Sequence, residues 1–174
     1  TLIDPNVSLE EPPDEEPPNE APNLTSAYTS TVEENASTDT VIYNIDAFDP
    51  DNDPLIHTIS GTDATYFTID SDDGEVRLIN SADYETKDSY TFDVKASDGE
   101  LDATKTVTVN VNDVNDAPTL ISSNTSTVEE NASTDTVIFN AEATDPDNDT
   151  LTYSISGTDA SYFTIDSDDG EVRL

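Results

Sequence analysis

Acidic side chains that recur at short intervals are the residues of this chain best suited to chemistry. The 174 residues include 40 Asp and Glu against 5 Lys and Arg, which gives a formal net charge of −35. In places the acids alternate with other residues, as in Asp49-Pro50-Asp51-Asn52-Asp53. Alternating acids in a loop aim successive oxygens at one point, and Ca²⁺ takes about six to eight oxygen ligands. The acids therefore indicate that the charged partners of this chain are cations.

Most of the acids in loops fall into clusters, and most clusters lie at the ends of expected β-strands. Five clusters stand out: Glu33-Glu34, Asp49 to Asp53, Asp83 to Glu85, Asp98 to Glu100, and Asn112 to Pro118. This grouping favours shared binding sites over a solvated surface adapted to salt. The salt-adapted surface remains the better explanation for individual acids, namely Asp70, Asp72, Asp73, Glu100 and Asp102.

The composition excludes several classes of function. Five basic residues cannot form the patch that binds a phosphate backbone or an anionic leaflet, so we expect no nucleic-acid binding. No apolar run approaches the roughly 18 residues of a membrane helix, so we expect no direct membrane insertion by this segment. The chain has no Cys, which removes disulfides and cysteine-ligated zinc. With only 33% hydrophobic residues, folding needs help, and a metal bound by oxygen ligands is the staple that remains.

Two specific alternatives to this interpretation also fail. An EF-hand loop needs Gly at position 6 and Glu at position 12, where this chain has Pro54 and Ser60, or Thr150 and Ser156. Catalysis by a carboxylate pair needs an apolar pocket that raises one pKa, whereas these acids lie in hydrophilic loops. No nucleophile elbow or phosphate-binding glycine loop occurs either, so we expect no enzyme.

An internal repeat organises the chain. At an offset of 96 residues, 43 of the 55 positions from Leu24 to Leu78 are identical to those from Leu120 to Leu174. A period this long suits a whole domain, and the second copy lacks everything equivalent to residues 79–118. We expect an acidic Pro-rich linker at 1–23, a complete repeat at 24–118 and the N-terminal part of a second at 119–174. The chain is then an internal piece of a larger protein, and its half repeat should be unstable or sticky.

Apolar residues alternate with period two within the first copy. The clearest runs are Tyr90, Phe92, Val94 and Ala96, and then Val107, Val109 and Val111. Together with shorter runs they make about seven strands in roughly 95 residues, a pattern typical of an all-β, immunoglobulin-like Greek-key β-sandwich. His57 alternates with Leu55 and Ile59, so we expect it at the edge of the core and not as a metal ligand or a base.

In order and spacing, the five clusters resemble the cadherin repeat. That family places Glu-Asn after the first strand, Asp-x-Asp after an Ala-containing strand, an Asp-Arg-Glu triplet, Asp-Gly, and a closing Asp-x-Asn-Asp-Asn-x-Pro linker. The corresponding residues here are Glu34-Asn35, Asp49-x-Asp51 after Ala47, Asp83-Tyr84-Glu85, Asp98-Gly99 and Asp113 to Pro118. Tyr84 replaces the usual Arg, and the linker is one residue shorter because it lacks the second Asn.

The resemblance implies Ca²⁺ bound between consecutive repeats. The first copy would supply Glu34, Asp83, Glu85, Asp113, Asn115, Asp116 and the Val114 carbonyl, and the second copy Asp145 and Asp147. The ion position nearest the second repeat would be incomplete, because the equivalent of Asp98 would fall at 194. Upstream, Pro17 and Glu20 stand where Asp113 and Asp116 would be, so Asp49, Asp51 and Asp98 should bind Ca²⁺ poorly.

The family resemblance further implies calcium-dependent, homophilic cell adhesion by an extracellular or cell-surface parent, with other copies of itself or cell-surface components as partners. Near-identical copies and a short linker are similar to the stalk repeats of bacterial surface adhesins, in which the repeat is a passive spacer. A carbohydrate-binding module of a secreted enzyme is a third interpretation. It needs exposed aromatic residues, and the absence of Trp disfavours it.

Overall fold

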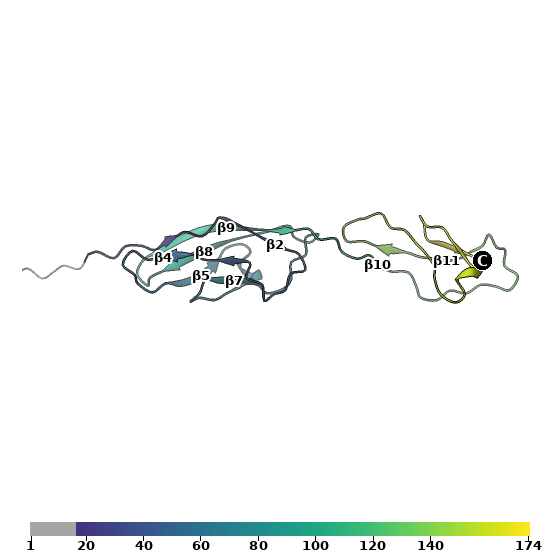
Figure 1. Cartoon of the computed structure of the whole chain (residues 1–174), viewed down its shortest axis with the longest axis horizontal. Helices are drawn as coiled ribbons and strands as arrows, with labels where there is room; N and C mark the ends of the chain where they lie inside the picture. The colour runs from purple at the N-terminus through teal and green to yellow at the C-terminus, as the bar shows by residue number, and fades with distance from the viewer. Residues whose placement is uncertain (1–16) are drawn as a thin grey trace, which may run out of the picture. The chain divides into compact units, whose positions relative to one another are not determined.

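The computed structural model describes residues 17–174, which form short β-strands joined by loops and two single 3-10 turns (Figure 1). The chain divides into two compact units. The first contains residues 17–32, 37–81 and 89–110 among those described, and the second contains residues 33–36, 82–88 and 111–174. No helix within residues 17–174 has the length and apolar character needed to cross a membrane.

Nine strands form three sheets in the first repeat. The largest sheet has the order β2-β9-β8-β5, a second has the order β3-β7-β6, and β1 pairs with β4. The strands are β1 (Asn23–Leu24), β2 (Thr29–Glu33), β3 (Tyr43–Asn44), β4 (Ala47–Phe48), β5 (Ile56–Ser60), β6 (Phe67–Ile69), β7 (Glu75–Leu78), β8 (Ser89–Ser97) and β9 (Asp102–Asn112).

Alternation of apolar and polar residues places β8 and β9 at the centre of the largest sheet. Nine consecutive antiparallel pairs join them, from Ser89 opposite Asn110 to Ser97 opposite Asp102. Successive side chains of a strand point to opposite faces, so Phe92 and Val94 are buried while Thr91 is exposed. β5 adds to the free side of β8 through five further pairs.

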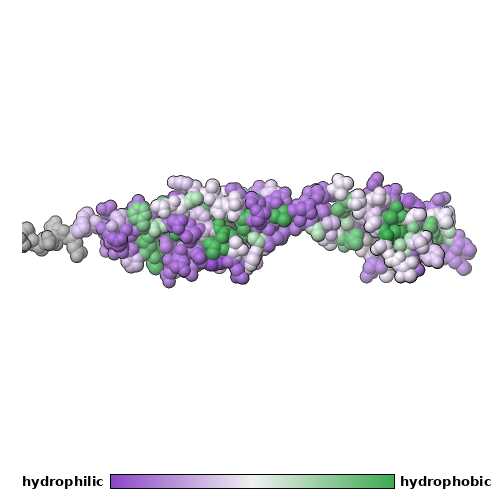
Figure 2. All heavy atoms as spheres, viewed as in Figure 1, coloured by the Kyte–Doolittle hydropathy of each residue, from purple (hydrophilic) through white to green (hydrophobic). Residues whose placement is uncertain are grey.

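Aromatic side chains join the two larger sheets and form the centre of the core. Phe92 of β8 meets Tyr43 of β3 edge to face at 6.2 Å and lies 4.6 Å from the Phe67 ring of β6. Phe67 also contacts Tyr90 at 5.4 Å. All four rings are buried, as the sequence pattern predicts. These contacts make the immunoglobulin-like β-sandwich, whose visible surface is mostly hydrophilic (Figure 2).

The strand that alternating residues predict over Val41 to Ala47 is divided into β3 and β4, because its backbone changes partners. The Ile45 N–H donates to the Gly74 carbonyl, which keeps this part of the chain beside β7. One residue later the Asp46 carbonyl accepts from the Thr25 N–H at 2.8 Å, so β4 pairs with β1 instead. β1 itself lies before the expected first strand around Ser26 to Val32, so about seven expected strands become nine.

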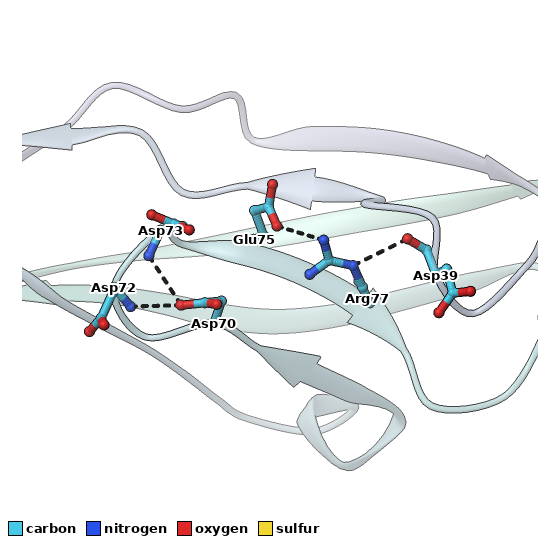
Figure 3. A network of polar contacts seen from close by, with 6 residues as sticks. All are labelled: Asp39, Asp70, Asp72, Asp73, Glu75 and Arg77. Carbon is cyan, nitrogen blue, oxygen red and sulfur yellow. Dashed lines mark hydrogen bonds and ion pairs between the residues drawn. The ribbon is translucent and has the colours of Figure 1, made fainter.

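A tight turn joins β6 to β7, and carboxylates fix its shape (Figure 3). Asp70 Oδ1 accepts the backbone N–H groups of Asp72 and Asp73 at 3.0 and 3.3 Å. Gly74 closes the turn with a φ of +74°, and a Cβ there would lie 2.8 Å from the Ile45 carbonyl oxygen. In the second copy, Asp166 accepts the Asp168 N–H at 3.0 Å, so both copies build the turn in the same way.

The second repeat keeps only part of this framework. It contains β10 (Thr119–Leu120), β11 (Val137–Asn140), β12 (Ala143–Thr144), β13 (Thr164–Ile165) and β14 (Glu171–Arg173). β10 pairs with β12 and β11-β14-β13 form a sheet, matching β1-β4 and β3-β7-β6. Residues 125–129 and 152–156, the equivalents of β2 and β5, form no strand within the described part of the chain.

Replacing Phe92 with Ala should destabilise the first repeat strongly. Phe92 is 1% exposed and contacts rings of the opposite sheet, so we expect a loss of about 3–5 kcal/mol in the free energy of unfolding. Chemical denaturation would measure it. Phe48→Ala is the matched control, because Phe48 is 54% exposed and should change stability by no more than about 0.5 kcal/mol. Equal effects of the two variants would contradict this account of the core.

Candidate metal centre

Glu34 lies at the end of β2 and is the most deeply buried acid of the predicted site, with 3% of its surface exposed. Its two carboxylate oxygens each accept a backbone hydrogen bond. Oε1 accepts the Val114 N–H at 2.7 Å and Oε2 accepts the Tyr84 N–H at 2.9 Å. A buried carboxylate whose two oxygens both accept hydrogen bonds is held in a fixed orientation. Glu34 therefore holds together loops that are far apart in the sequence.

The residue that follows, Asn35, gives this turn its direction. Its φ of 58° lies in the left-handed region, which Asn adopts more readily than most residues. The Asn35 N–H donates to the Ala82 carbonyl at 3.0 Å, and its Nδ2 donates to Asp116 Oδ1 at 3.0 Å. The Glu34 N–H donates to the Asn112 carbonyl at 3.0 Å. Three segments of the second unit, 33–36, 82–88 and 111–116, are thus fastened side by side.

Four carboxylates converge where these segments meet residues 145–149. One oxygen from each of Glu34, Glu85, Asp113 and Asp147 lies within 4.8 Å of all the others. Two ligands on opposite sides of a Ca²⁺ ion are about 4.6–5.2 Å apart, twice the usual distance of about 2.3–2.6 Å, so oxygens this close together can share one ion. The size and chemistry of the group fit Ca²⁺.

The charges in this group oppose one another. Loss of solvent around the Glu85 carboxyl group raises its pKa, and the carboxylates of Glu34, Asp147 and Asp113 raise it further. The pKa of Asp113 is raised in the same way, by loss of solvent and then by Asp147, Glu34 and Asp116. Every charged neighbour that acts on these two groups is another carboxylate. Such a group stabilises the fold poorly unless a cation or protons neutralise it.

The remaining predicted ligands make hydrogen bonds of their own, most of them within a single turn. The Asp116 N–H donates to Asp147 Oδ2 at 2.6 Å, and Asn115 Nδ2 donates to the Asp116 carbonyl at 3.1 Å. Asp83 accepts from the N–H and hydroxyl of Thr86, and Asp145 Oδ1 accepts the Asp149 N–H at 3.1 Å. Of the nine predicted positions, the structure therefore brings four side chains into the tight group and leaves Asp83 and Asp145 bonded within their own turns.

Asn35 is the residue of this site that the predicted ligand set omits. Its side chain bonds a predicted ligand, and its backbone conformation aims Glu34 inward. The sequence contained a signal, because the same Glu-Glu-Asn segment recurs in the second copy, where Asn131 has a φ of 61°. A recurrent Asn directly after an acid at a strand end is typical of a left-handed turn.

At the other end of the first repeat, hydrogen bonds engage the acids that should bind Ca²⁺ poorly. Asn19 Nδ2 donates to Asp98 Oδ2 at 3.0 Å, and the Glu20 N–H donates to Asp51 Oδ2 at 2.7 Å. Asp49 Oδ1 accepts the N–H groups of Asp51 and Asp53. The last residues of the predicted linker thus contact the first unit, whereas residues 1–16 lie outside the described residues.

Comparison with known families supports the motif pattern. Residues 28–112 match the family model described as the cadherin domain. The chain belongs to the cadherin family. Human Cadherin-23 is 38% identical over 134 residues, which cover 74% of this chain and 4% of that protein. Human Protocadherin Fat 4 is 32% identical over 163 residues, covering 86% of this chain and 3% of that relative. This chain therefore spans only a small part of the length of these relatives.

Solved structures agree with the fold. Human Protocadherin-24 EC1-2, form II, superposes with a TM-score of 0.70 at 26% identity, over 90% of this chain and 78% of that one. Mouse Cadherin-23 EC22-24 superposes with a TM-score of 0.59 at 26% identity, over 88% of this chain. The cadherin relatives of this segment are extracellular or cell-surface proteins.

Because the pKa of Glu85 is raised, we expect the stability of the folded state in metal-free buffer to depend on pH. The folded state binds a proton at higher pH than the unfolded chain, whose Glu has a pKa near 4.5, so Glu85 lowers stability as pH rises through its folded pKa. Glu85→Gln should therefore raise the melting temperature at pH 7, and the gain should vanish by about pH 4. Thermal melts across this range would measure it.

Asp98→Asn is the control, because we expect it to change stability in the opposite direction to Glu85→Gln. Hydrogen bonds from the Leu101 and Glu100 N–H groups lower the pKa of Asp98, so this carboxylate contributes stability above the unfolded pKa and loses it as pH falls through the folded one. The variant should be less stable than the wild type at pH 7, and the difference in melting temperature between the two should disappear at low pH. A Glu85→Gln protein that melts below the wild type at pH 7 without metal would contradict the repulsion described above.

Proposed function

We propose that this chain binds Ca²⁺ where its two cadherin repeats adjoin in sequence and that the bound ion stiffens a rod of tandem domains. The observation that carries the proposal is the convergence of Glu34, Glu85, Asp113 and Asp147 within 4.8 Å. The first three precede the predicted boundary after residue 118 and the fourth follows it. Such a set of ligands would couple one repeat to the next.

The proposed ligand set extends beyond these four carboxylates. Asp83, Asn115, Asp116, Asp145 and the Val114 carbonyl complete it by their positions in the family motifs. Asp116 has the most support among them, because its backbone N–H already bonds Asp147 and its side chain bonds Asn35. The domain division at 1–23, 24–118 and 119–174 belongs to the same proposal.

The chain's own residues prepare this site before any ion binds. The Val114 and Tyr84 N–H groups hold Glu34 in place, and the Asn35 amide holds Asp116. Bound Ca²⁺ supplies two positive charges, which offset the repulsion that raises the pKa of Glu85 and Asp113. Without that charge the acids repel one another and leave residues 112–118 free to bend. The repulsion and its removal are the physical basis of the proposed stiffening.

Calorimetric titration with Ca²⁺ should detect this site on the full chain. Extracellular modules bind Ca²⁺ with dissociation constants of about 10⁻⁴–10⁻³ M, and Ca²⁺ at 100 times that constant would stabilise the folded state by about 2.7 kcal/mol. Asp113→Asn removes a ligand charge and should weaken binding by roughly tenfold or more. Thermal melts with Ca²⁺ and with chelator would report the linked stability.

Asp72→Asn is the matched control for this titration, because Asp72 is an exposed acid in the β6–β7 turn. It should bind Ca²⁺ as the wild type does. Absence of binding heat, together with identical melts in Ca²⁺ and chelator, would mean that the acids form only a solvated surface. An equal loss of Ca²⁺ affinity in the Asp72 and Asp113 variants would instead indicate that binding depends on the net charge of the chain and not on a specific site.

We further propose that the parent protein acts in cell adhesion, with other copies of itself or cell-surface components as partners. Membership of the cadherin family supports this role. A passive stalk, as in a large bacterial adhesin, is the second candidate. The near-identity of the two copies favours the stalk, because a spacer needs only repeated units and no distinct binding face.

Beads coated with the full chain should separate these two roles. For homophilic adhesion, we expect the beads to cluster in millimolar Ca²⁺ and to disperse in chelator, and Asp113→Asn should abolish clustering. Light scattering would follow the clusters, and Asp72→Asn beads are the control. Beads that stay dispersed in Ca²⁺, while Ca²⁺ still raises the melting temperature, would assign the segment to the stalk.

A further inference from the structure

Residues 17–24 lead into the first repeat and bond to two of its loops. Asn19 Nδ2 donates to Asp98 Oδ2 at 3.0 Å, and the Glu20 N–H donates to Asp51 Oδ2 at 2.7 Å. Asp98 follows β8 and Asp51 follows β4, so these loops are far apart in the sequence. Because Asn19 and Glu20 are neighbours, their bonds hold the two loops and the incoming segment together.

Further contacts fasten the chain just after these two bonds. Pro22 is buried, and β1 pairs with β4. Lys105 Nζ, from β9, donates to the carbonyls of Leu24 and Ser26 at 3.3 and 2.6 Å. Proline also fixes φ at three positions of the segment, residues 17, 18 and 22. Holding Asn19 and Glu20 in place therefore costs little additional chain entropy.

The linker between the two repeats makes the same backbone contact. At the offset of 96 residues, Glu20 corresponds to Asp116. The Asp116 N–H donates to Asp147 Oδ2 at 2.6 Å, as the Glu20 N–H donates to Asp51 Oδ2 at 2.7 Å. The two segments can therefore be compared position by position.

Charge distinguishes the two segments. Asp147 belongs to the four converging carboxylates, the only such group within residues 17–174, whereas Pro17 stands at the position that corresponds to Asp113. The carboxylate of Asp98 meets neutral donors instead. N–H groups of its own turn lower its pKa, and the Asn19 amide lowers it further. An acid satisfied by neutral donors needs no cation to offset its charge.

The sequence before this segment does not supply the missing acids. Residues 6–16 correspond to β9 at the same offset, and the three buried valines of β9 correspond to Glu11, Pro13 and Glu15. This stretch has none of the apolar alternation that predicts a core strand. The sequence therefore does not predict a further repeat directly before residue 17, whose acids would be needed to complete a metal site there.

We propose that residues 17–24 form an arm that stays locked to the first repeat without a metal ion, through the bonds of Asn19 to Asp98 and of Glu20 to Asp51. The arm gives the first repeat a fixed entry that Ca²⁺ does not change. Residues 112–118, by contrast, belong to the proposed calcium site and respond to the ion. Hydrogen bonds thus fasten one end of the repeat, and charge neutralisation fastens the other.

NMR relaxation of the full chain in chelator tests the arm. The backbone amides of residues 19–21 should have order parameters near about 0.85, the value of rigid backbone, and millimolar Ca²⁺ should leave them unchanged. Values below about 0.6 in chelator, or rigid values reached only with Ca²⁺, would overturn the proposal. The Asp116 amide in the same spectra reports on the calcium proposal, so the two proposals can fail independently.

A substitution of Asn19 tests the first bond of the lock. Asn19→Asp replaces the donor amide with a carboxylate beside Asp98, and the order parameters of residues 19–21 should fall below about 0.6 in chelator. Asn44→Asp is the matched control, because Asn44 Nδ2 donates to Asp46 Oδ1 at 3.1 Å elsewhere in the first unit. The control should leave residues 19–21 rigid. Equal effects of the two variants, or no effect of Asn19→Asp, would overturn the lock.

A substitution of Asp51 tests the second bond. Asp51→Ala removes the acceptor of the Glu20 N–H and should speed hydrogen exchange at the Glu20 amide by at least about tenfold. Asp53→Ala is the control in the same loop, because the Asp53 bond to Asp49 Oδ1 is made by the backbone N–H, which the substitution leaves in place. Exchange at Glu20 that is equal in the wild type and Asp51→Ala, or equally fast in both variants, would contradict the proposed arm.

Discussion

The pairing of β8 with β9 is the interaction on which the sandwich depends. Nine residue pairs join the two strands, and their inward side chains supply Phe92, Val94, Val107 and Val109 to the core. The second repeat shows what remains without them. Its two smaller sheets persist, while the flanking strands of the largest sheet are absent among the described residues. Only β13 and β14 are joined by a tight turn, and β10–β12 and β11–β14 pair segments that are well separated in the sequence. The loss of β2 and β5 equivalents therefore follows from their missing partner strands and not from a general absence of non-local pairing.

Carboxylates serve two opposite purposes in this acidic chain. Asp70 and Asp98 each accept backbone N–H groups of their own turns, which lowers the pKa of both and stabilises the loops. Glu85 and Asp113 face other carboxylates, which contributes to raising the pKa of both. Asp70 and Asp98 make a structure with few apolar residues more stable as the pH rises through their folded pKa values. Glu85 and Asp113 take part in repulsion that is concentrated at one site, where a bound cation can offset it.

Sequence patterns predicted the sandwich and drew attention to the four acids that lie together in the structure, but they did not predict the hydrogen bonds that hold this group. Alternating residues such as Tyr90 and Phe92 identify core strands directly, because side-chain direction in a strand has a period of two. The break at Ile45–Asp46 depends on which strands lie on either side, and only tertiary structure supplies that. Likewise, the motif predicts Glu34 as a ligand, whereas its burial and its bonds to Tyr84 and Val114 arise from the meeting of distant loops.

The near-identity of the two copies also bears on folding kinetics. During synthesis from the N-terminus, the strands up to Leu78 emerge before the β8–β9 hairpin of their own repeat, and the second copy presents nearly the same segment again. A hairpin that meets two near-identical partner segments can pair with the wrong one. The speed with which β8 and β9 close on their own repeat would then decide the yield of correctly folded protein.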